Sequence, residues 1–301
     1  MISRVTNHTL MRSAQANLQA NMSQLARLQE QATSQKALTR PSDNPTAAAD
    51  SLTVRADQRA AAQYRRNVDN GDGWLTTIDA ALSTTTGILN DIRDLTVQGA
   101  NDGAMSSQAK EAIAAELSGL RDELLKQANA TYLGRSVFAG TSDASSAFVV
   151  DPVTGSTTFT GVSDASVQRR IGAGTTVRVD ADGSAIFDGG ADGVSVFALV
   201  DTLIADLHND VNVGRHLTAI DERMGTVLGH HTEIGARHSH IQRAQDALME
   251  LSGSLEAQRM AIEDVDLSQV ILDLKIQEVT YQAALAVTAR ALQPTLMDFL
   301  R

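Results

Sequence analysis

The fold of this chain of 301 residues is decided by the stretch TRPSDNP at residues 39–45. Proline removes a backbone donor and clashes with the preceding turn of a helix, so two prolines four residues apart separate one helix from the next. Asp43 or Asn44 is expected to cap the second helix, with Pro45 in its first turn, where a missing N–H costs nothing. The stretch therefore predicts a break between two helices.

Apolar residues on both sides of this break recur at intervals of three and four, which is typical of a helix with one apolar seam. Before the break they are Met11, Ala14, Leu18, Met22, Leu25, Leu28 and Ala32. After it, a helix is expected to run to about Gly99 with a seam of Gly71, Leu75, Ile78, Leu82, Thr85, Leu89, Ile92 and Thr96. At about 1.5 Å per residue this helix is roughly 80 Å long, too long for a compact globule.

Further helices are expected from Ser106 or Ser107, over 199–207, and over about 214–260, where several glycines leave a break open. The last segment has the most regular seam: Leu267, Ile271, Leu274, Glu278, Tyr281, Leu285, Thr288, Leu292 and Phe299. Residues 1–40 are mostly basic and residues 262–301 mostly acidic. Two seams of opposite charge predict an antiparallel pairing of the chain ends, in which the apolar contacts contribute more than exposed ion pairs.

The centre of the chain has a different composition. Leu is absent between Leu133 and Leu199, while five of the six Phe lie there. Short runs of Phe, Val and Thr between Gly and Asp predict strands at 147–150, 157–160, 167–171, 175–179 and 185–187. The predicted fold is mainly α with a β insertion. Its expected domains are a terminal coiled-coil assembly domain (1–40 with 262–301), a helical rod (41–135 with 197–261) and an inserted β domain (136–196).

Composition excludes several classes of protein. The absence of cysteine rules out disulfides, thiolate metal sites and cysteine nucleophiles. A net charge of −11 argues against nucleic acid as a partner, because phosphate binding needs clustered Lys and Arg. Apolar runs stay well below the roughly 18 residues needed to span a bilayer, so membrane insertion is not expected. The first residues also lack the apolar core of a cleavable signal peptide.

Motifs that carry chemistry are weak. The cluster of His230, His231, His238 and His240 lacks the spacing of three or four that zinc pairs use, so a solvated helix face is expected. The Asp-Gly runs at 180–183 and 188–193 lack the full ligand series of a calcium loop and are interpreted as turns. Residues 172–174 are interpreted as a turn as well. We expect no catalytic residue, no metal site and no cofactor.

Two other groups of residues have structural interpretations. Tyr64 and Trp74 are expected to pack within the helices. Four arginines at 55, 59, 65 and 66 are interpreted as a face that is either solvated or directed at another subunit.

Four stretches together resemble the flagellin superfamily: Asn17–Gln35, Arg40–Pro45, Tyr132–Thr141 and Ala291–Leu300. The resemblance implies a flagellin-like arrangement of long helices. Flagellins usually carry an acidic pair and Ala-Ala-Gly after the first helix, whereas PSDNP at 41–45 is similar to the branch of the superfamily that joins hook to filament. The ending DFL at 298–300 is similar to that branch too, although Asn44 stands where a second Asp is common.

The resemblance implies a structural subunit without enzymatic activity, secreted through the flagellar type III export channel and extracellular in the flagellum. It would form the junction between hook and filament by terminal helix packing. The implied partners are flagellin, flagellar hook-associated protein 1, other copies of the chain and an export chaperone. The seam positions predict the contacts of assembly, made by Leu18, Met22, Leu25, Leu28, Leu267, Ile271, Leu274, Tyr281, Leu285, Leu292 and Phe299.

Two alternatives remain open at this stage. The chain could be flagellin itself, the bulk subunit of the filament. It could also carry a binding or enzymatic β domain, residues 141–195, on a helical stalk.

Overall fold

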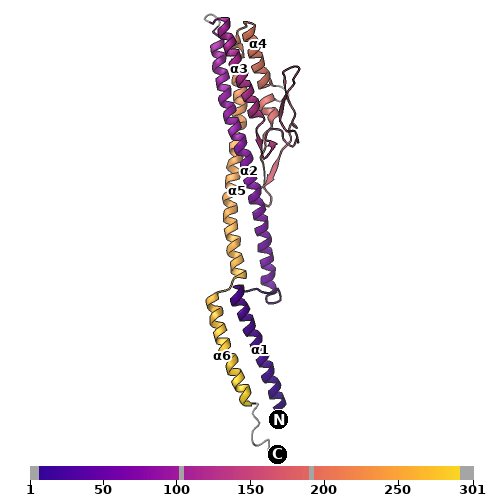
Figure 1. Ribbon diagram of the computed structural model, residues 1–301, viewed down its shortest axis with the longest axis vertical. Coiled ribbons are helices and arrows are strands. Elements are labelled where there is room, and N and C mark those ends of the chain that lie inside the picture. The colour runs from indigo at the N-terminus through magenta and orange to yellow at the C-terminus, as the bar shows by residue number, and fades with distance from the viewer. Residues whose placement is uncertain (1–6, 102–104, 190–192, 292–301) are drawn as a thin grey trace, which may run out of the picture. The chain divides into compact units, whose positions relative to one another are not determined.

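The computed structural model describes residues 7–101, 105–189 and 193–291. Their helices are α1 (Asn7–Ser34), α2 (Pro45–Gly99), α3 (Ser107–Ala128), α4 (Val196–His208), α5 (Leu217–Glu263) and α6 (Leu267–Ala291), shown in Figure 1. Their strands are β1 (Thr131–Tyr132), β2 (Arg135–Ser136), β3 (Phe148–Val150), β4 (Thr157–Phe159), β5 (Gln168–Arg170) and β6 (Thr176–Arg178). Each odd strand pairs with the next one in an antiparallel hairpin. The predicted mainly α fold with a β insertion is confirmed.

The chain forms two compact units. The first draws on Met1–Ala60 and Ser252–Arg301, and the second on Ala61–Leu251. Helices α2 and α5 contribute to both. Within the described residues, no helix has both the length and the apolar character required to cross a bilayer.

The break at residues 39–45 lies where the sequence predicts it. Asn44 Oδ1 accepts a hydrogen bond from the Ala47 N–H at 3.1 Å and thereby caps α2. Asp43 closes the turn instead, because its Oδ2 accepts from the Arg40 N–H at 3.0 Å and from Thr39 Oγ1 at 3.1 Å. The two candidate caps thus have separate tasks.

The second unit has its core along α2. All eight predicted seam positions of this helix, from Gly71 to Thr96, are buried. A Cβ added at Gly71 would lie 3.1 Å from Ile241 of α5, and the α5 residues Val227, Ile234 and Ile241 are at most 2% exposed. Helix α5 is unbroken, and its Gly225, Gly229 and Gly235 lie where an added Cβ would meet nothing within 4 Å.

The β insertion has an aromatic core. Phe148 lies between Phe159, Phe187 and Phe197, with ring centroids 5.2 to 5.6 Å apart. Offset and edge contacts of this kind stabilise beyond the area that they bury. Phe197 belongs to α4, so the core of the insertion is shared with a helix.

Two predictions about the strands were incomplete or wrong. The strand predicted at 185–187 is instead a helical turn, Ser184–Asp188, because Asp182 Oδ1 accepts from the Ser184 N–H, the Ser184 hydroxyl and the Ala185 N–H. The β1–β2 hairpin was not predicted. Its two turn residues, Leu133 and Gly134, have φ of 50° and 77°, and leucine at such a position gives no sequence signal for a tight turn.

Candidate assembly site on the terminal helices

Helices α1 and α6 pack antiparallel in the first unit, as the sequence predicts (Figure 1). On α1 the side that faces α6 carries half-buried residues at intervals of three and four: Ala14, Leu18, Asn21, Leu25, Leu28 and Ala32. On α6 it carries Val270, Leu274, Gln277, Tyr281, Ala284 and Thr288, which are buried or half-buried. This inner seam contains five of the predicted assembly residues: Leu18, Leu25, Leu28, Leu274 and Tyr281.

Other predicted assembly residues lie outside the inner seam. Met22 is 59% exposed on α1, and Leu267, Ile271 and Leu285 are 38%, 47% and 42% exposed at the edge of α6. Asn21 occupies the inner position that the sequence pattern gave to Met22, one residue away. Leu292 and Phe299 lie outside the described residues.

A polar contact interrupts the inner seam. Gln277, 8% exposed, donates from Nε2 to the backbone oxygen of Asn21 at 3.2 Å and to Asn21 Oδ1 at 3.4 Å. A part-buried amide pair between the apolar sides of two helices disfavours other registers, because sliding the helices would leave these groups without partners. Asn21 and Gln277 therefore fix which turns of α1 and α6 meet.

Helix α6 carries a second apolar surface opposite the inner seam. Its members share a spacing of three to four residues, or eight across Ala283, and each is more than half exposed: Leu272, Ile276, Val279 and Val287. At 100° per residue they lie on the side of the helix that faces away from α1. We call them the outer stripe. Sequence reasoning missed it because only one seam per helix was sought, although the signal was the same spacing in a shifted frame.

Glu263 connects the ends of three segments of the first unit. It is 2% exposed, and its carboxylate accepts from Arg55 Nε and Nη2 at 2.6 and 2.7 Å and from Ser51 Oγ at 2.6 Å, both on α2. Its backbone oxygen accepts from the Ala37 N–H at 2.7 Å, in the connection between α1 and α2. The bidentate bond from Arg55 lowers the pKa of Glu263 to about 2, against the opposing effect of burial.

Ion pairs between α1 and α6 were expected from the opposite charges of the chain ends, but none joins the described parts of the two helices. The charged residues instead pair locally. Arg40 approaches Glu30 at 3.8 Å, and Lys275 approaches Glu278 at 2.9 Å. The two helices are held by their seam and by the amide contact.

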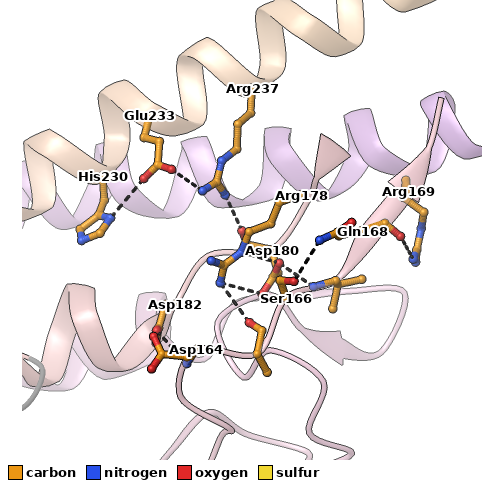
Figure 2. A network of polar contacts seen from close by, with 12 residues as sticks. Asp164, Ser166, Gln168, Arg169, Arg178, Asp180, Asp182, His230, Glu233 and Arg237 are labelled. Atoms are coloured by element: carbon orange, nitrogen blue, oxygen red, sulfur yellow. Dashed lines mark hydrogen bonds and ion pairs between the residues drawn. The ribbon is translucent and has the colours of Figure 1, made fainter. Parts of the chain in front are cut away.

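In the second unit, Asp180 anchors the β5–β6 hairpin. This carboxylate is fully buried and accepts from the Val167 N–H at 2.8 Å and from Arg178 Nε at 3.0 Å. Arg237 of α5 donates to the Asp180 backbone oxygen at 2.9 Å and also pairs with Glu233, as Figure 2 shows. The hydrogen bond that Arg178 donates to Asp180 is the main cause of the raised pKa of Arg178, and desolvation by burial opposes it. The hairpin is thus bonded to α5.

The histidines of α5 pair with carboxylates of the second unit. His231 Nε2 lies 2.9 Å from Asp79 Oδ1, and His238 Nε2 lies 2.8 Å from Asp72 Oδ1, one heptad apart on both helices. His230 approaches Glu233 of its own helix at 3.7 Å. Within the described residues no three His, Asp or Glu side chains are placed to share a metal ion.

The chain is similar to flagellar proteins over most of its length. The family model of the bacterial flagellin N-terminal helical region matches residues 5–143, and that of the bacterial flagellin C-terminal helical region matches residues 217–300. Flagellar hook-associated protein 3 of Salmonella typhimurium is 24% identical, covering 93% of this chain and 94% of that protein. Flagellin of Bacillus subtilis is 26% identical, covering 92% of each. A solved structure of a candidate flagellar hook-associated protein from Vibrio parahaemolyticus has a TM-score of 0.66 at 27% identity, covering 73% of this chain and 99% of that one.

Proposed function

Because the chain belongs to the bacterial flagellin family, we propose that it is a structural subunit of the flagellum that forms the junction between hook and filament. Its likeness over nearly the whole length to hook-associated protein 3, together with the solved hook-associated structure, supports the junction over other places in the flagellum. The subunit acts by packing against its neighbours and has no enzymatic activity.

The outer stripe is the observation that carries this function. Leu272, Ile276, Val279 and Val287 expose 55%, 55%, 66% and 67% of their surface on one side of α6. An exposed apolar surface of this kind marks an interface, since water solvates it poorly. The outer stripe and the inner seam give α6 two apolar sides, one for α1 and one for a neighbouring subunit.

The predicted assembly residues divide between these two tasks. Leu18, Leu25, Leu28, Leu274 and Tyr281 hold the helix pair together. Met22, Leu267, Ile271 and Leu285 lie at its edges, where a neighbour can cover them, and Leu292 and Phe299 are proposed to extend the contact. The neighbours are flagellin, flagellar hook-associated protein 1 and further copies of the chain.

Export and localisation follow from the same proposal. The subunit reaches the outside of the cell through the flagellar type III channel, and an export chaperone shields the apolar sides of its terminal helices until assembly. A chain without cysteine passes such a channel without forming disulfides on the way.

Electron microscopy of cells that lack the gene tests the junction function. We expect hooks without filaments and free flagellin in the medium, both reversed by the intact chain. A variant with Ile276→Glu and Val279→Glu should be made and folded but should leave the hooks bare, because two carboxylates oppose burial of the outer stripe. Gln282→Glu, an exposed position on the same helix, is the matched control and should restore filaments. Normal filaments in cells without the gene would refute the function.

The bulk filament is the second candidate, favoured by the 26% identity to Bacillus subtilis flagellin. The amount of this chain in a preparation of sheared flagella distinguishes the two functions. A filament subunit dominates the preparation, whereas a junction subunit is a minor component.

A further inference from the structure

Four arginines gather where strand β5 lies along helix α2 in the second unit. Asn67 Nδ2 donates to the Arg170 backbone oxygen at 2.8 Å, and Arg169 Nε donates to Asn70 Oδ1 at 2.8 Å, so the strand is bonded to two successive turns of α2. Figure 2 shows Arg169 on its strand. We call the following residues the arginine patch: Arg65, Arg66, Arg169 and Arg170.

Hydrogen bonds hold part of this patch in place. Arg66 donates to Gln63 Oε1, Gln63 Nε2 donates to Asn67 Oδ1 at 3.0 Å, and Asn67 bonds the strand. The chain of bonds runs from one arginine of α2 to the backbone of Arg170. The side chains of Arg66 and Arg169 and the backbone of Arg170 are therefore held in place.

Within the described residues, no carboxylate forms an ion pair with the arginine patch. Arg65, Arg66 and Arg170 are exposed and Arg169 is half-buried, and no ion pair involves any of the four. Asp69 lies on the next turn of α2 but forms no ion pair with them. In contrast, Arg55, Arg93, Arg121, Arg178 and Arg237 each pair with a carboxylate. Clustered cations without a partner raise the local potential and attract an anionic surface.

We propose that the arginine patch docks onto an acidic face of a second copy of the chain, formed by Glu116, Asp122 and Glu123 of α3. This inference rests on the proposed assembly function. The three carboxylates are exposed, lie within eight residues of one helix and have no partner in the described part of the chain. Many other carboxylates of the second unit already have internal partners: Asp72, Asp79, Asp180, Asp201, Asp206, Asp221 and Glu233.

The signs of the two surfaces determine the symmetry of the contact. A patch of one sign repels its own copy, so it cannot form the centre of a twofold dimer. Because the patch and the acidic face belong to different elements, their contact is head-to-tail and repeats from copy to copy, giving a ring or a helix. The net charge of −11 keeps separate copies apart, while the local attraction selects this orientation.

Cysteine cross-linking tests the contact without altering any charge, since the chain has no cysteine of its own. Ala62 is exposed one turn before Arg66, and Gly119 lies between Glu116 and Glu123, where an added Cβ meets nothing within 4 Å. In flagella oxidised before denaturation, the variant with Ala62→Cys and Gly119→Cys should form a ladder of covalent multimers. Either single variant should remain monomeric. Dimers of the Ala62→Cys variant would overturn the proposal, because they would place patch against patch.

Charge reversal provides the second measurement. In the double-cysteine chain, Arg66→Glu with Arg170→Glu should abolish the ladder, and adding Glu116→Arg with Glu123→Arg should restore it. Arg243→Glu, at an exposed position of α5 without a carboxylate partner, is the matched control and should leave the ladder unchanged. Circular dichroism of each purified chain checks that it is folded.

The two failures are distinguishable. If filaments form normally on the hooks and the double-cysteine chain gives no ladder, the docking proposal is wrong and the junction function stands. The docking proposal is also wrong if Arg66→Glu with Arg170→Glu blocks assembly and Glu116→Arg with Glu123→Arg does not restore it. The arginine patch would then bind another protein. Filaments on hooks in the absence of the gene would overturn the function itself.

Discussion

Replacing Glu263 by glutamine should loosen the first unit. Glutamine has the same size but no charge, so the bidentate bond from Arg55 becomes a weaker bond to one neutral oxygen, and the Ser51 hydroxyl loses a charged acceptor. With a folded pKa of about 2 and an ordinary glutamate pKa of about 4.3, at about 1.36 kcal/mol per pKa unit, the charged form contributes at most about 3 kcal/mol. The Arg55 side chain is 48% exposed, so solvent screening reduces this to about 2 kcal/mol.

The same pKa gives the pH dependence. Glu263 has a lower pKa in the folded chain than in the unfolded chain, so the unfolded chain binds more protons between these values. The stabilisation is complete above about pH 4.5 and is lost as the pH falls toward 2. A chain with glutamine at position 263 lacks this group and should lack this part of the acid sensitivity.

Amide hydrogen exchange read by peptide measures the effect where it occurs. At pH 6, peptides from residues 45–60 and 252–263 of Glu263→Gln should exchange about 30 times faster than those of the natural chain, since about 1.4 kcal/mol corresponds to a tenfold change. Peptides from the second unit should be unaffected. Glu250→Gln is the matched control, because Glu250 is an exposed acid on the same helix that forms no ion pair within the described residues. Equal exchange rates in the natural chain and the Glu263→Gln variant at pH 6 would refute the reasoning. So would an equal loss of protection in the two chains when the pH is lowered from 5 to 3.

Two further changes test the inner seam and the insertion. Gln277→Ala should destabilise the α1–α6 pair by about 1 to 2 kcal/mol, because Asn21 loses its partner. The double variant with Asn21→Leu and Gln277→Leu should restore or raise the midpoint of thermal unfolding while weakening the register of the two helices. A double variant less stable than Gln277→Ala would contradict this. Phe148→Ala should lower the free energy of unfolding, measured in urea, by about 3 to 5 kcal/mol, since the ring lies among three others and is 2% exposed. A loss below about 1 kcal/mol would show that the four rings do not stabilise the unit together.

Long periodic segments could be predicted from the sequence because their information is local. The seam of α2 was predicted position by position from Gly71 to Thr96, and every one of these residues is buried. The break at residues 39–45 and a cap by Asp43 or Asn44 were likewise predicted from residues a few positions apart, and the structure assigns the cap to Asn44. Such features depend on backbone geometry that a few neighbouring side chains decide.

Features that depend on distant partners could not be predicted. Asn21 and Met22 are adjacent, and only Gln277, 256 residues away in sequence, determines that Asn21 faces inward. The segment Ala185–Phe187 has the composition of a strand, but the Asp182 carboxylate ends any extended backbone there. The role of Glu263 was also missed, since a single glutamate near the end of a helix carries no sequence signal until Arg55 and Ser51 are placed beside it.

The aromatic core also bears on the idea that the insertion is a separate functional domain on a helical stalk. Phe148 packs on Phe197 of α4, Arg121 of α3 donates to the Gly155 backbone oxygen, and Arg237 of α5 donates to the Asp180 backbone oxygen. Removing residues 141–195 would expose these helix surfaces and would take from Arg121 and Arg237 their acceptors in the insertion, leaving each arginine only its pair with Asp201 or Glu233. The bonds make the insertion part of the second unit, so its excision would disturb the unit itself.

The inner seam and the outer stripe of α6 differ in polarity and exposure, and this difference allows the chain both to fold as a subunit and to assemble with neighbours. The inner seam contains Gln277 and Thr288 among its apolar residues, which limits the burial that α1 alone can provide. The outer stripe holds four large apolar side chains that are more than half exposed. Burying the exposed part of each at about 25 cal/mol per Å² contributes on the order of 1 kcal/mol, so the stripe supplies roughly 4 kcal/mol, close to the total stability of a small domain. A neighbour that covers the stripe therefore adds to the stability that α1 gives α6, which couples the folding of the chain ends to assembly.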